Sequence, residues 1–294
     1  MVMISRSPQL LPLYLCLLFA PVLGFTQSFP LHPSPELPEF ARDSVHLLPK
    51  VSAHRGGGNY PGYPENCLAS FEYIASQVPT LIECDIRMSR DSVLLLMHDR
   101  SLDRTTNGTG LVSSHDWEYL STLQLKDNDG TQTDYPIPTL EDALQWAKGG
   151  VILTLDIKRG VSCALVVSAI QKVEAQAYSV VIAYNLSDAL AIYEMDSTLL
   201  ISVSMRNEAE RAAAMESGIP PQNMLAFTGT RLSDPVLYQR INEAKIVSSL
   251  GSLGNLDEQA LARGMHLYDD WQAMGIRIFA TDYPIEVSRY LQDR

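Results

Sequence analysis

The sequence has little cysteine and an excess of negative over positive charge. Four cysteines occur in 294 residues, too few for a disulfide framework, and their spacing matches no zinc motif. Cys67 and Cys84 are expected either as one disulfide or as two buried thiols. Lys and Arg number 22 against 34 Asp and Glu, a formal net charge of −12 that argues against a nucleic-acid partner. After the first 24 residues, no apolar run approaches the ~18 residues of a membrane span.

The amino-terminal segment has the pattern of a secretory signal peptide. Residues 1–24 contain one positive charge, at Arg6, followed by an apolar run that ends at Leu23. We expect a periplasmic or secreted protein with no stable membrane insertion once this segment is removed. Residues 25–48 are rich in Pro and Ser and show no helical or strand period, so we expect a leader segment on the surface.

From residue 49 to residue 294, short apolar or β-branched runs alternate with helical patterns. Eight strands are expected, at 51–55, 81–86, 152–157, 180–184, 200–205, 224–227, 246–250 and 276–281. Helices are expected between them, including 64–78 and 139–148, and Thr139 and Asp142 have the spacing of a capping box. This alternation is typical of the α/β class and predicts a TIM (β/α)8 barrel.

The alternation is interrupted once, over about residues 88–138. The stretch contains an apolar run at 93–97 and a turn-rich segment at 105–110. Roughly fifty residues are too many for an ordinary connection between a strand and a helix. Since function in such barrels gathers in the loops that follow the strands, we expect a small insertion after strand two, on the catalytic face.

Four polar clusters lie at the ends of the first three expected strands or inside the insertion. They are His54 with Arg55, Glu83 with Asp85, Asp156 with Lys158, and His98 with Asp99. Residues two apart in a strand share a face, so Glu83 and Asp85 point the same way, and Asp156 is expected beside them. Clustered carboxylates repel one another, and a hard divalent ion with oxygen ligands relieves that repulsion.

The remaining members of these clusters suit a phosphate ester. The planar guanidinium of Arg55 matches a phosphate group, and Lys158 is placed to face a substrate oxyanion. His54 and His98 have side chains that exchange protons near neutral pH. Each cluster alone also fits an ordinary role, such as an Asp–Lys ion pair, but their coincidence at one barrel mouth indicates phosphodiester cleavage.

An ordered set of motifs resembles the glycerophosphodiester phosphodiesterase family. The matching segments are 54–56, 64–66, 69–71, 83–85, 98–110, 137–141 and 281–284, and the resemblance covers most of residues 50–290. It implies a TIM barrel with a small insertion, and metal-dependent hydrolysis of small glycerophosphodiesters to glycerol 3-phosphate and an alcohol. It also implies residue roles: His54 and His98 as general acid and base, Arg55 and Lys158 as phosphate contacts, and Glu83 and Asp85 as metal ligands.

Two points of the resemblance leave alternatives open. The family usually has Glu as its third ligand, whereas this chain has Asp156, one methylene shorter, so Ca²⁺ and Mg²⁺ both remain candidates. Glu65 and Asn66 either orient the ligands or begin the first helix. Attack by a glycerol hydroxyl to form a cyclic phosphate and direct attack by water are both compatible with these residues.

Two other functional classes are weaker candidates. A lipid phosphodiesterase acting on phosphoinositide or sphingolipid head groups would need a basic or apolar docking surface, and this acidic chain has no basic cluster. A non-catalytic barrel would not need both histidines, both cations and three carboxylates. The sequence therefore predicts an enzyme with a small-molecule substrate.

Overall fold

The computed structural model describes residues 47–292. The expected signal peptide and nearly all of the expected leader segment lie outside these residues. Within them, eight parallel strands follow one another around a barrel: β1 (Val51–Ala53), β2 (Leu81–Met88), β6 (Leu153–Ile157), β7 (Ser179–Ala183), β8 (Leu200–Ser204), β9 (Met224–Phe227), β10 (Val247–Gly251) and β11 (Ile278–Thr281). Strand β1 pairs with both β11 and β2, which closes the sheet.

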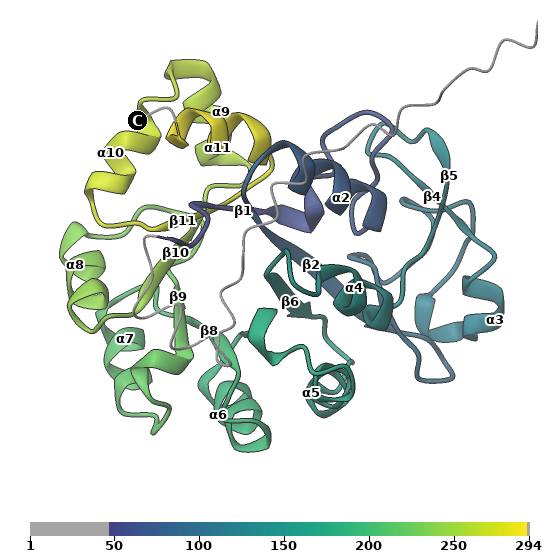
Figure 1. Cartoon of the computed structure of the whole chain (residues 1–294), viewed down its shortest axis with the longest axis horizontal. Helices are drawn as coiled ribbons and strands as arrows, with labels where there is room; N and C mark the ends of the chain where they lie inside the picture. The colour runs from purple at the N-terminus through teal and green to yellow at the C-terminus, as the bar shows by residue number, and fades with distance from the viewer. Residues whose placement is uncertain (1–46, 293–294) are drawn as a thin grey trace, which may run out of the picture.

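A ring of helices surrounds the strands (Figure 1). These helices are α2 (Leu68–Gln77), α4 (Leu140–Ala147), α5 (Cys163–Lys172), α6 (Leu186–Met195), α7 (Glu208–Met215), α8 (Pro235–Glu243), α9 (Asn255–Arg263), α10 (Leu267–Ala273) and α11 (Pro284–Gln292). Each barrel strand is followed by at least one of them, so the predicted α/β TIM barrel is confirmed. Among the described residues, no helix has both the length and the apolar character that crossing a bilayer requires.

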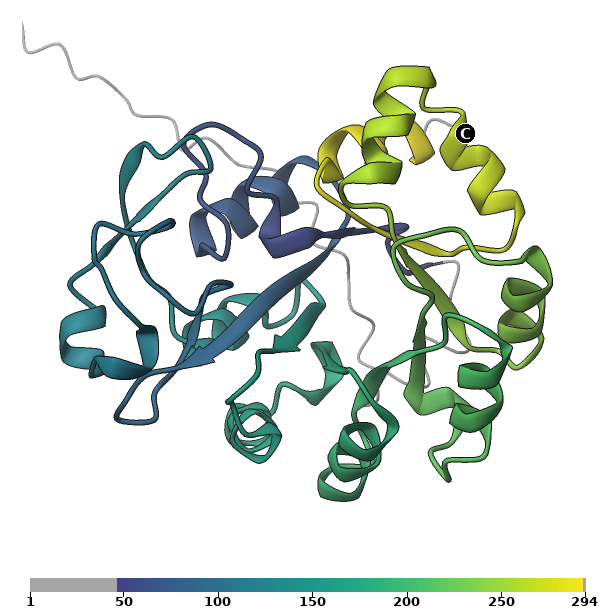
Figure 2. The same ribbon diagram turned by 180° about the vertical axis from the view of Figure 1, so that it is seen from behind.

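The predicted insertion lies between β2 and α4. It contains β3 (Leu94–Leu96), α3 (Trp117–Leu120), β4 (Gln124–Lys126) and β5 (Gln132–Pro136), and it stands beside the barrel in both views (Figures 1 and 2). Strand β3 pairs antiparallel with the end of β2, while β4 and β5 form a separate two-stranded sheet. A hydrophobic cluster of its own, including Leu102, Leu120 and Leu125, stabilises this unit.

Several expected boundaries differ from the observed ones, and two of these differences have a cause in the backbone angles. The first strand ends at Ala53 instead of residue 55, because Arg55 takes a left-handed φ of 51° in a short 3₁₀ turn, His54–Gly56. The first helix begins at Leu68 instead of residue 64, because Asn66 has a φ of 55°. Neither angle continues a strand or a right-handed helix. The capping box at Thr139 is confirmed, since its hydroxyl accepts from the Asp142 amide and the Asp142 carboxylate accepts from the Thr139 amide.

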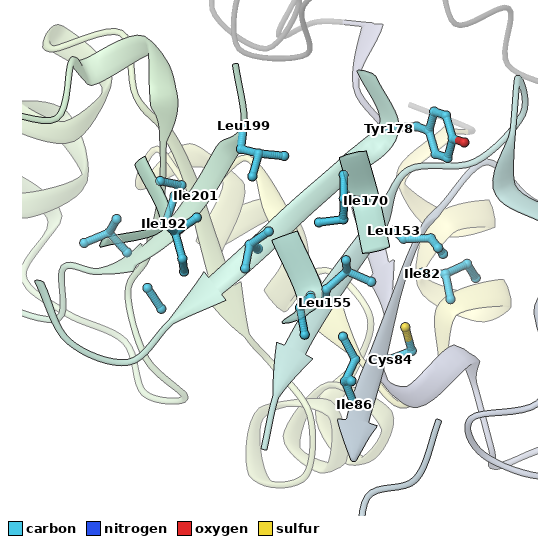
Figure 3. Close-up of a cluster of buried hydrophobic side chains, with 14 of the residues drawn as sticks. Ile82, Cys84, Ile86, Leu153, Leu155, Ile170, Tyr178, Ile192, Leu199 and Ile201 are labelled. Atoms are coloured by element: carbon cyan, nitrogen blue, oxygen red, sulfur yellow. The ribbon is translucent and has the colours of Figure 1, made fainter. Parts of the chain in front are cut away.

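The largest hydrophobic core fills the space between the strands and the helices. Figure 3 shows part of it, where Cys84 and Ile86 of β2 lie near Leu155 of β6. Cys84 and Cys67 are both buried free thiols, so the disulfide alternative is wrong. A second layer of eight apolar side chains packs together, with six from barrel strands and two, Leu48 and Ile152, from just before β1 and β6: Leu48, Leu81, Ile152, Val180, Leu200, Leu225, Val247 and Ile278. Since these residues lie at or just before the strand starts, the layer closes that end of the barrel, and the polar clusters lie toward the opposite end.

Candidate active site

The first polar cluster is held in a tight turn at the end of β1. Gly56 has a φ of 70°, and a Cβ placed on it would lie 2.0 Å from a ring carbon of Phe71, so only glycine fits. The backbone amide of Arg55 donates to Glu83 Oε2 at 2.7 Å. This hydrogen bond joins the turn to β2 and sets His54 and Arg55 beside the carboxylates of the neighbouring strand.

Three carboxylates meet at the barrel mouth. Glu83, Asp85 and Asp156 are buried, and each offers a ligand oxygen within 4.8 Å of the others. Asp85 and Asp156 are register partners on adjacent strands, which brings them together. Lys158 Nζ lies 2.5 Å from Asp85 Oδ1 and 2.5 Å from Asp156 Oδ2. The spacing of two residues within each strand therefore places all four side chains in one cluster, as predicted.

The single positive charge of Lys158 does not neutralise the three carboxylates of Glu83, Asp85 and Asp156. Burial, and then the charge of Asp85, raise the pKa of Glu83 to about 8. Burial also acts to raise the pKa of Asp85, but Lys158 outweighs it and the net pKa is lowered. For Lys158, burial acts to lower the pKa and the two aspartates outweigh it, so the net pKa is raised. A carboxyl that resists ionisation at neutral pH beside two others fits a site for a divalent cation.

His54 is paired with a carboxylate from the opposite end of the sequence. Its Nδ1 lies 2.7 Å from Oδ1 of Asp282, which directly follows β11, and Asp282 Oδ2 accepts from the Gly254 amide at 3.1 Å. Burial acts to lower the pKa of His54, but the Asp282 hydrogen bond and the charge of Glu83 outweigh it, so the net pKa is raised. The pair leaves Nε2 of His54 as the ring nitrogen available for proton exchange.

The second histidine has a carboxylate partner of its own, in the insertion. His98 Nδ1 lies 2.7 Å from Asp99 Oδ1, and Asp99 Oδ2 accepts from Arg104 Nε at 2.7 Å. The two amino groups of Arg104 donate to the two oxygens of buried Glu65, at 2.7 and 2.9 Å. Glu65 also contacts Arg55 at 3.2 Å. Glu65 therefore joins the insertion to the barrel.

Asn66 pairs with Asp85 through two hydrogen bonds. The Asn66 amide nitrogen donates to Asp85 Oδ2 at 2.7 Å, and its carbonyl oxygen accepts from the Asp85 backbone amide at 2.8 Å. This arrangement fixes the Asp85 carboxylate and leaves Oδ1 facing Lys158. Glu65 and Asn66 precede helix α2, so the interpretation that they begin the first helix is wrong.

All the sequence-predicted site residues lie near the barrel mouth or are connected to it by hydrogen bonds, but the contacts of Asp282, Arg104 and Tyr184 were not predicted. Asp282 lies in the motif at 281–284, and Arg104 lies in the motif at 98–110. Neither motif indicates that Asp282 contacts His54 or that Arg104 contacts Glu65. Tyr184 directly follows β7, and its hydroxyl lies 2.8 Å from both oxygens of Asp156. Its place at the end of an expected strand was the available signal.

The fold and the site together define a class. A TIM barrel with an acidic triad, an adjacent arginine and lysine, and two histidine–carboxylate pairs is an arrangement suited to general acid–base chemistry on a phosphate ester. Comparison with known proteins agrees with this class. The chain belongs to the glycerophosphoryl diester phosphodiesterase family, whose family model matches residues 54–280.

Two curated relatives match parts of the chain. Human glycerophosphodiester phosphodiesterase 1 is 32% identical over 151 residues, which cover 49% of this chain and 43% of that protein. A probable glycerophosphodiester phosphodiesterase 1 of Mycobacterium tuberculosis is 39% identical over 119 residues, covering 38% and 40%. The chain thus spans less than half the length of these relatives in each match.

Solved structures match over a larger share. A glycerophosphoryl diester phosphodiesterase from Parabacteroides distasonis has 30% identity and a TM-score of 0.75, with 90% of both chains covered. A phosphodiesterase from Oleispira antarctica, in complex with the product sn-glycerol-3-phosphate, has 20% identity and a TM-score of 0.66, covering 85% of this chain and 99% of that one. At 20% identity, the match to the Oleispira antarctica structure shows that the two proteins share a fold.

Proposed function

We propose that this chain hydrolyses glycerophosphodiesters to glycerol 3-phosphate and an alcohol. The observation that carries the proposal is the acidic triad combined with two histidines, each hydrogen-bonded to a carboxylate. Family membership supports the same reaction. The product in the Oleispira antarctica structure supports glycerol 3-phosphate as the phosphate-bearing product. The alternative of a lipid phosphodiesterase has no such support.

In this proposal His54 and His98 are the general base and general acid. Each uses Nδ1 for its carboxylate partner, which leaves Nε2 to exchange a proton with the substrate. One imidazole removes the proton of the attacking hydroxyl, and the other protonates the leaving alkoxide. The attacking group is a glycerol hydroxyl or water, since the same pair of histidines serves both.

Arg55 and Lys158 are the proposed phosphate contacts. Arg55 Nε is buried without a hydrogen-bond partner among the described residues, although Asp85 Oδ2 lies 3.8 Å away. A buried, unpaired guanidinium N–H is costly, and a phosphate oxygen would satisfy it. Lys158 spends two of its three N–H donors on Asp85 and Asp156, which leaves the third for a phosphate oxygen.

Glu83, Asp85 and Asp156 are the proposed ligands of one divalent ion, Ca²⁺ or Mg²⁺. Their oxygen donors, their proximity and the raised pKa of Glu83 fit such an ion. When bound, the ion supplies charge neutralisation at the phosphate. Asp156→Asn removes one carboxylate charge from the triad and should chiefly weaken the dependence of turnover on metal; an unchanged metal titration in that variant would exclude Asp156 as a ligand.

The test is release of glycerol 3-phosphate from a panel of glycerophosphodiesters, with Ca²⁺, with Mg²⁺ and with a chelator. We expect release that the chelator abolishes. His54→Ala and His98→Ala should each lower turnover by about 10²–10⁴-fold, the usual contribution of general acid–base catalysis. His266→Ala, in the loop before α10, is the matched histidine control. An active His54→Ala protein would overturn the assigned mechanism, and a folded wild-type protein without release would overturn the function.

The proposed location of the enzyme is the periplasm or the exterior of the cell. Its support is the sequence of residues 1–24, with one positive charge before an apolar run. Expression of the full chain, followed by fractionation and amino-terminal sequencing, tests it. A mature protein that begins near residue 25 in an exported fraction is expected. An intact amino terminus in the cytoplasmic fraction would contradict it.

A further inference from the structure

Two cavities meet at the Asp156–Lys158 pair. The inner cavity, of about 270 Å³, lies inside the barrel mouth and is lined by His54, Glu83 and Asp156. The outer cavity, of about 530 Å³, is lined by Lys158 and by residues around the starts of α5 and α6. Tyr184 and Ile182 line both cavities. The wall between them therefore lies beside the Asp156–Lys158 pair, since the Tyr184 hydroxyl donates to Asp156 and Asp156 accepts from Lys158, one of the two proposed phosphate contacts.

A phosphodiester has two alcohol arms that leave the phosphorus in different directions. We propose that the inner cavity accepts the glycerol arm, and that the outer cavity is the head-group subsite, selective for an alcohol that carries a carboxylate or a phosphate. This inference rests on the proposed function and adds the substrate class. Two cavities that share a wall at Tyr184, beside Lys158, provide one space for each arm of a phosphate held at that lysine.

The inner cavity suits glycerol in size and chemistry. Its lining combines hydroxyl groups of Ser52, Ser202 and Ser249 with apolar side chains such as Leu225 and Phe227, which suit the hydroxyls and the carbon chain of glycerol respectively. Hydroxyls donate to and accept from the hydroxyls of a polyol. The outer cavity has about twice the volume and lies within the usual range of ~300–1,000 Å³ for small-molecule sites, so it suits the variable arm.

The outer cavity has an excess of positive charge in a chain whose formal net charge is −12. Arg87 is fixed at its edge, because Nε and one amino group donate to the His98 carbonyl oxygen at 2.9 and 2.6 Å. Its other amino group has no hydrogen bond within residues 47–292 and is left for a ligand. Arg159 is exposed and forms no ion pair with another described residue.

The single acidic residue lining the outer cavity does not cancel this charge. Asp188 accepts a hydrogen bond from the Asn185 side-chain amide at 2.7 Å, at the start of α6. Lys158 is occupied by two carboxylates, so Arg87 and Arg159 are the cations that remain for a head group. A guanidinium matches the planar, two-oxygen geometry of a carboxylate and also binds phosphate. An acidic head group therefore fits better than a purely cationic one.

Glycerophosphoserine and glycerophosphoethanolamine form a matched pair of probes, because they differ by one carboxylate. The measured quantity is the ratio of their kcat/KM values with the purified full chain and its required metal. We expect the wild-type ratio to favour glycerophosphoserine about fivefold, the size of a partly exposed ion pair. Arg159→Ala should lower the ratio toward one, with Arg87 retaining part of the preference, and Arg159→Glu should favour glycerophosphoethanolamine.

Arg263→Ala is the control, since Arg263 is an exposed arginine at the end of α9 and lines neither cavity. It should retain the wild-type ratio. A wild-type ratio of one, or a ratio that Arg159→Ala and Arg159→Glu leave unchanged, would overturn the head-group subsite while hydrolysis itself stands. Hydrolysis of neither probe by folded protein, nor of any other glycerophosphodiester, would instead overturn the proposed function.

Discussion

At the scale of single residues, the pairing of His54 with Asp282 has a measurable consequence. Asp282→Asn keeps the shape of the side chain but removes the charge that raises the pKa of His54. We expect kcat/KM to fall by about 10²-fold, within the range of general acid–base contributions, and the His54 pKa in the pH profile to move downward. The pH dependence of kcat/KM measures both effects.

The control for this prediction is Asp129→Asn, because Asp129 is an exposed aspartate in the insertion. That protein should keep the wild-type rate and pH profile. If Asp282→Asn lowered the rate without moving the profile, the aspartate would be a structural residue and not a partner of the imidazole.

Tyr184 forms hydrogen bonds with Asp156, the proposed metal ligand whose side chain is one methylene shorter than the usual Glu. Its hydroxyl donates to the Asp156 carboxylate, within 2.8 Å of both oxygens, and so fixes the orientation of that carboxylate. Tyr184→Phe should weaken divalent-ion binding about tenfold, since loss of a partner that orients a ligand costs 10–100-fold in affinity. Calorimetric titration of the metal measures this without any assay of turnover.

Tyr193→Phe is the matched variant, because Tyr193 lies in α6 and has no hydrogen bond from its hydroxyl within the described part of the chain. Equal metal affinity in Tyr184→Phe and Tyr193→Phe would show that Tyr184 does not position Asp156.

The sequence predicted local relations among site residues and missed distant ones. Glu83 and Asp85 share a face because a strand alternates with a period of two, and that rule needs no tertiary structure. Asp282 reaches His54 across 228 positions only because β11 closes the barrel against β1. Arg104 likewise reaches Glu65 only after the insertion has folded back. Neither contact follows from a period or a short motif.

At the scale of the element, the capping box of α4 contributes stability that the sequence itself indicates. The Thr139 hydroxyl accepts from the Asp142 amide at 3.0 Å. Thr139→Ala should lower the free energy of unfolding by about 1 kcal/mol. For a domain of this size, that loss lowers Tm by about 2–4 °C. Urea and thermal denaturation measure the two quantities.

Ser162→Ala is the control for the capping box, because Ser162 occupies the same position before α5 but its side chain makes no capping hydrogen bond. Ser162→Ala should lower the free energy of unfolding by less than Thr139→Ala does. Equal losses in the two variants would contradict the contribution assigned to the Thr139 hydroxyl.

Element boundaries were harder to predict than element types. Apolar periodicity identified a strand near residue 51 and a helix near residue 70, since both bury apolar side chains. The periodicity carries no information on φ, so it did not reveal the left-handed angles of Arg55 and Asn66 that end the strand early and delay the helix. Both residues lie in the site, where unusual backbone angles are concentrated.

At the scale of the whole molecule, the acidic triad couples the stability of the barrel to pH. The pKa of Glu83 is about 8 in the folded protein, against 4.5 for an unperturbed glutamate. Between these values the folded state binds more protons than the unfolded state, so stability falls as pH rises. The raised pKa of His54 acts in the same direction above its ordinary value. Metal-free protein should therefore be less stable at pH 8 than at pH 5.

Urea unfolding in the presence of a chelator, at several pH values, measures this slope. Glu83→Gln replaces the carboxyl by a neutral group of the same shape and should flatten the slope. Glu216→Gln, at an exposed position following α7, should leave it unchanged. A metal-free wild-type protein whose stability rises between pH 5 and pH 8 would contradict the raised pKa of Glu83.

A divalent ion should reverse this pH dependence. The ion binds carboxylates and not carboxylic acids, so its stabilisation grows as pH rises through the Glu83 pKa. At one hundred times Kd, binding to the folded state alone adds about 2.7 kcal/mol, which for a domain of this size raises Tm by roughly 5–10 °C. Thermal unfolding with and without metal, at pH 5 and pH 8, measures the difference. A Tm that metal raises equally at both values would mean that protons and the ion do not compete for the triad, and that the ligands lie elsewhere.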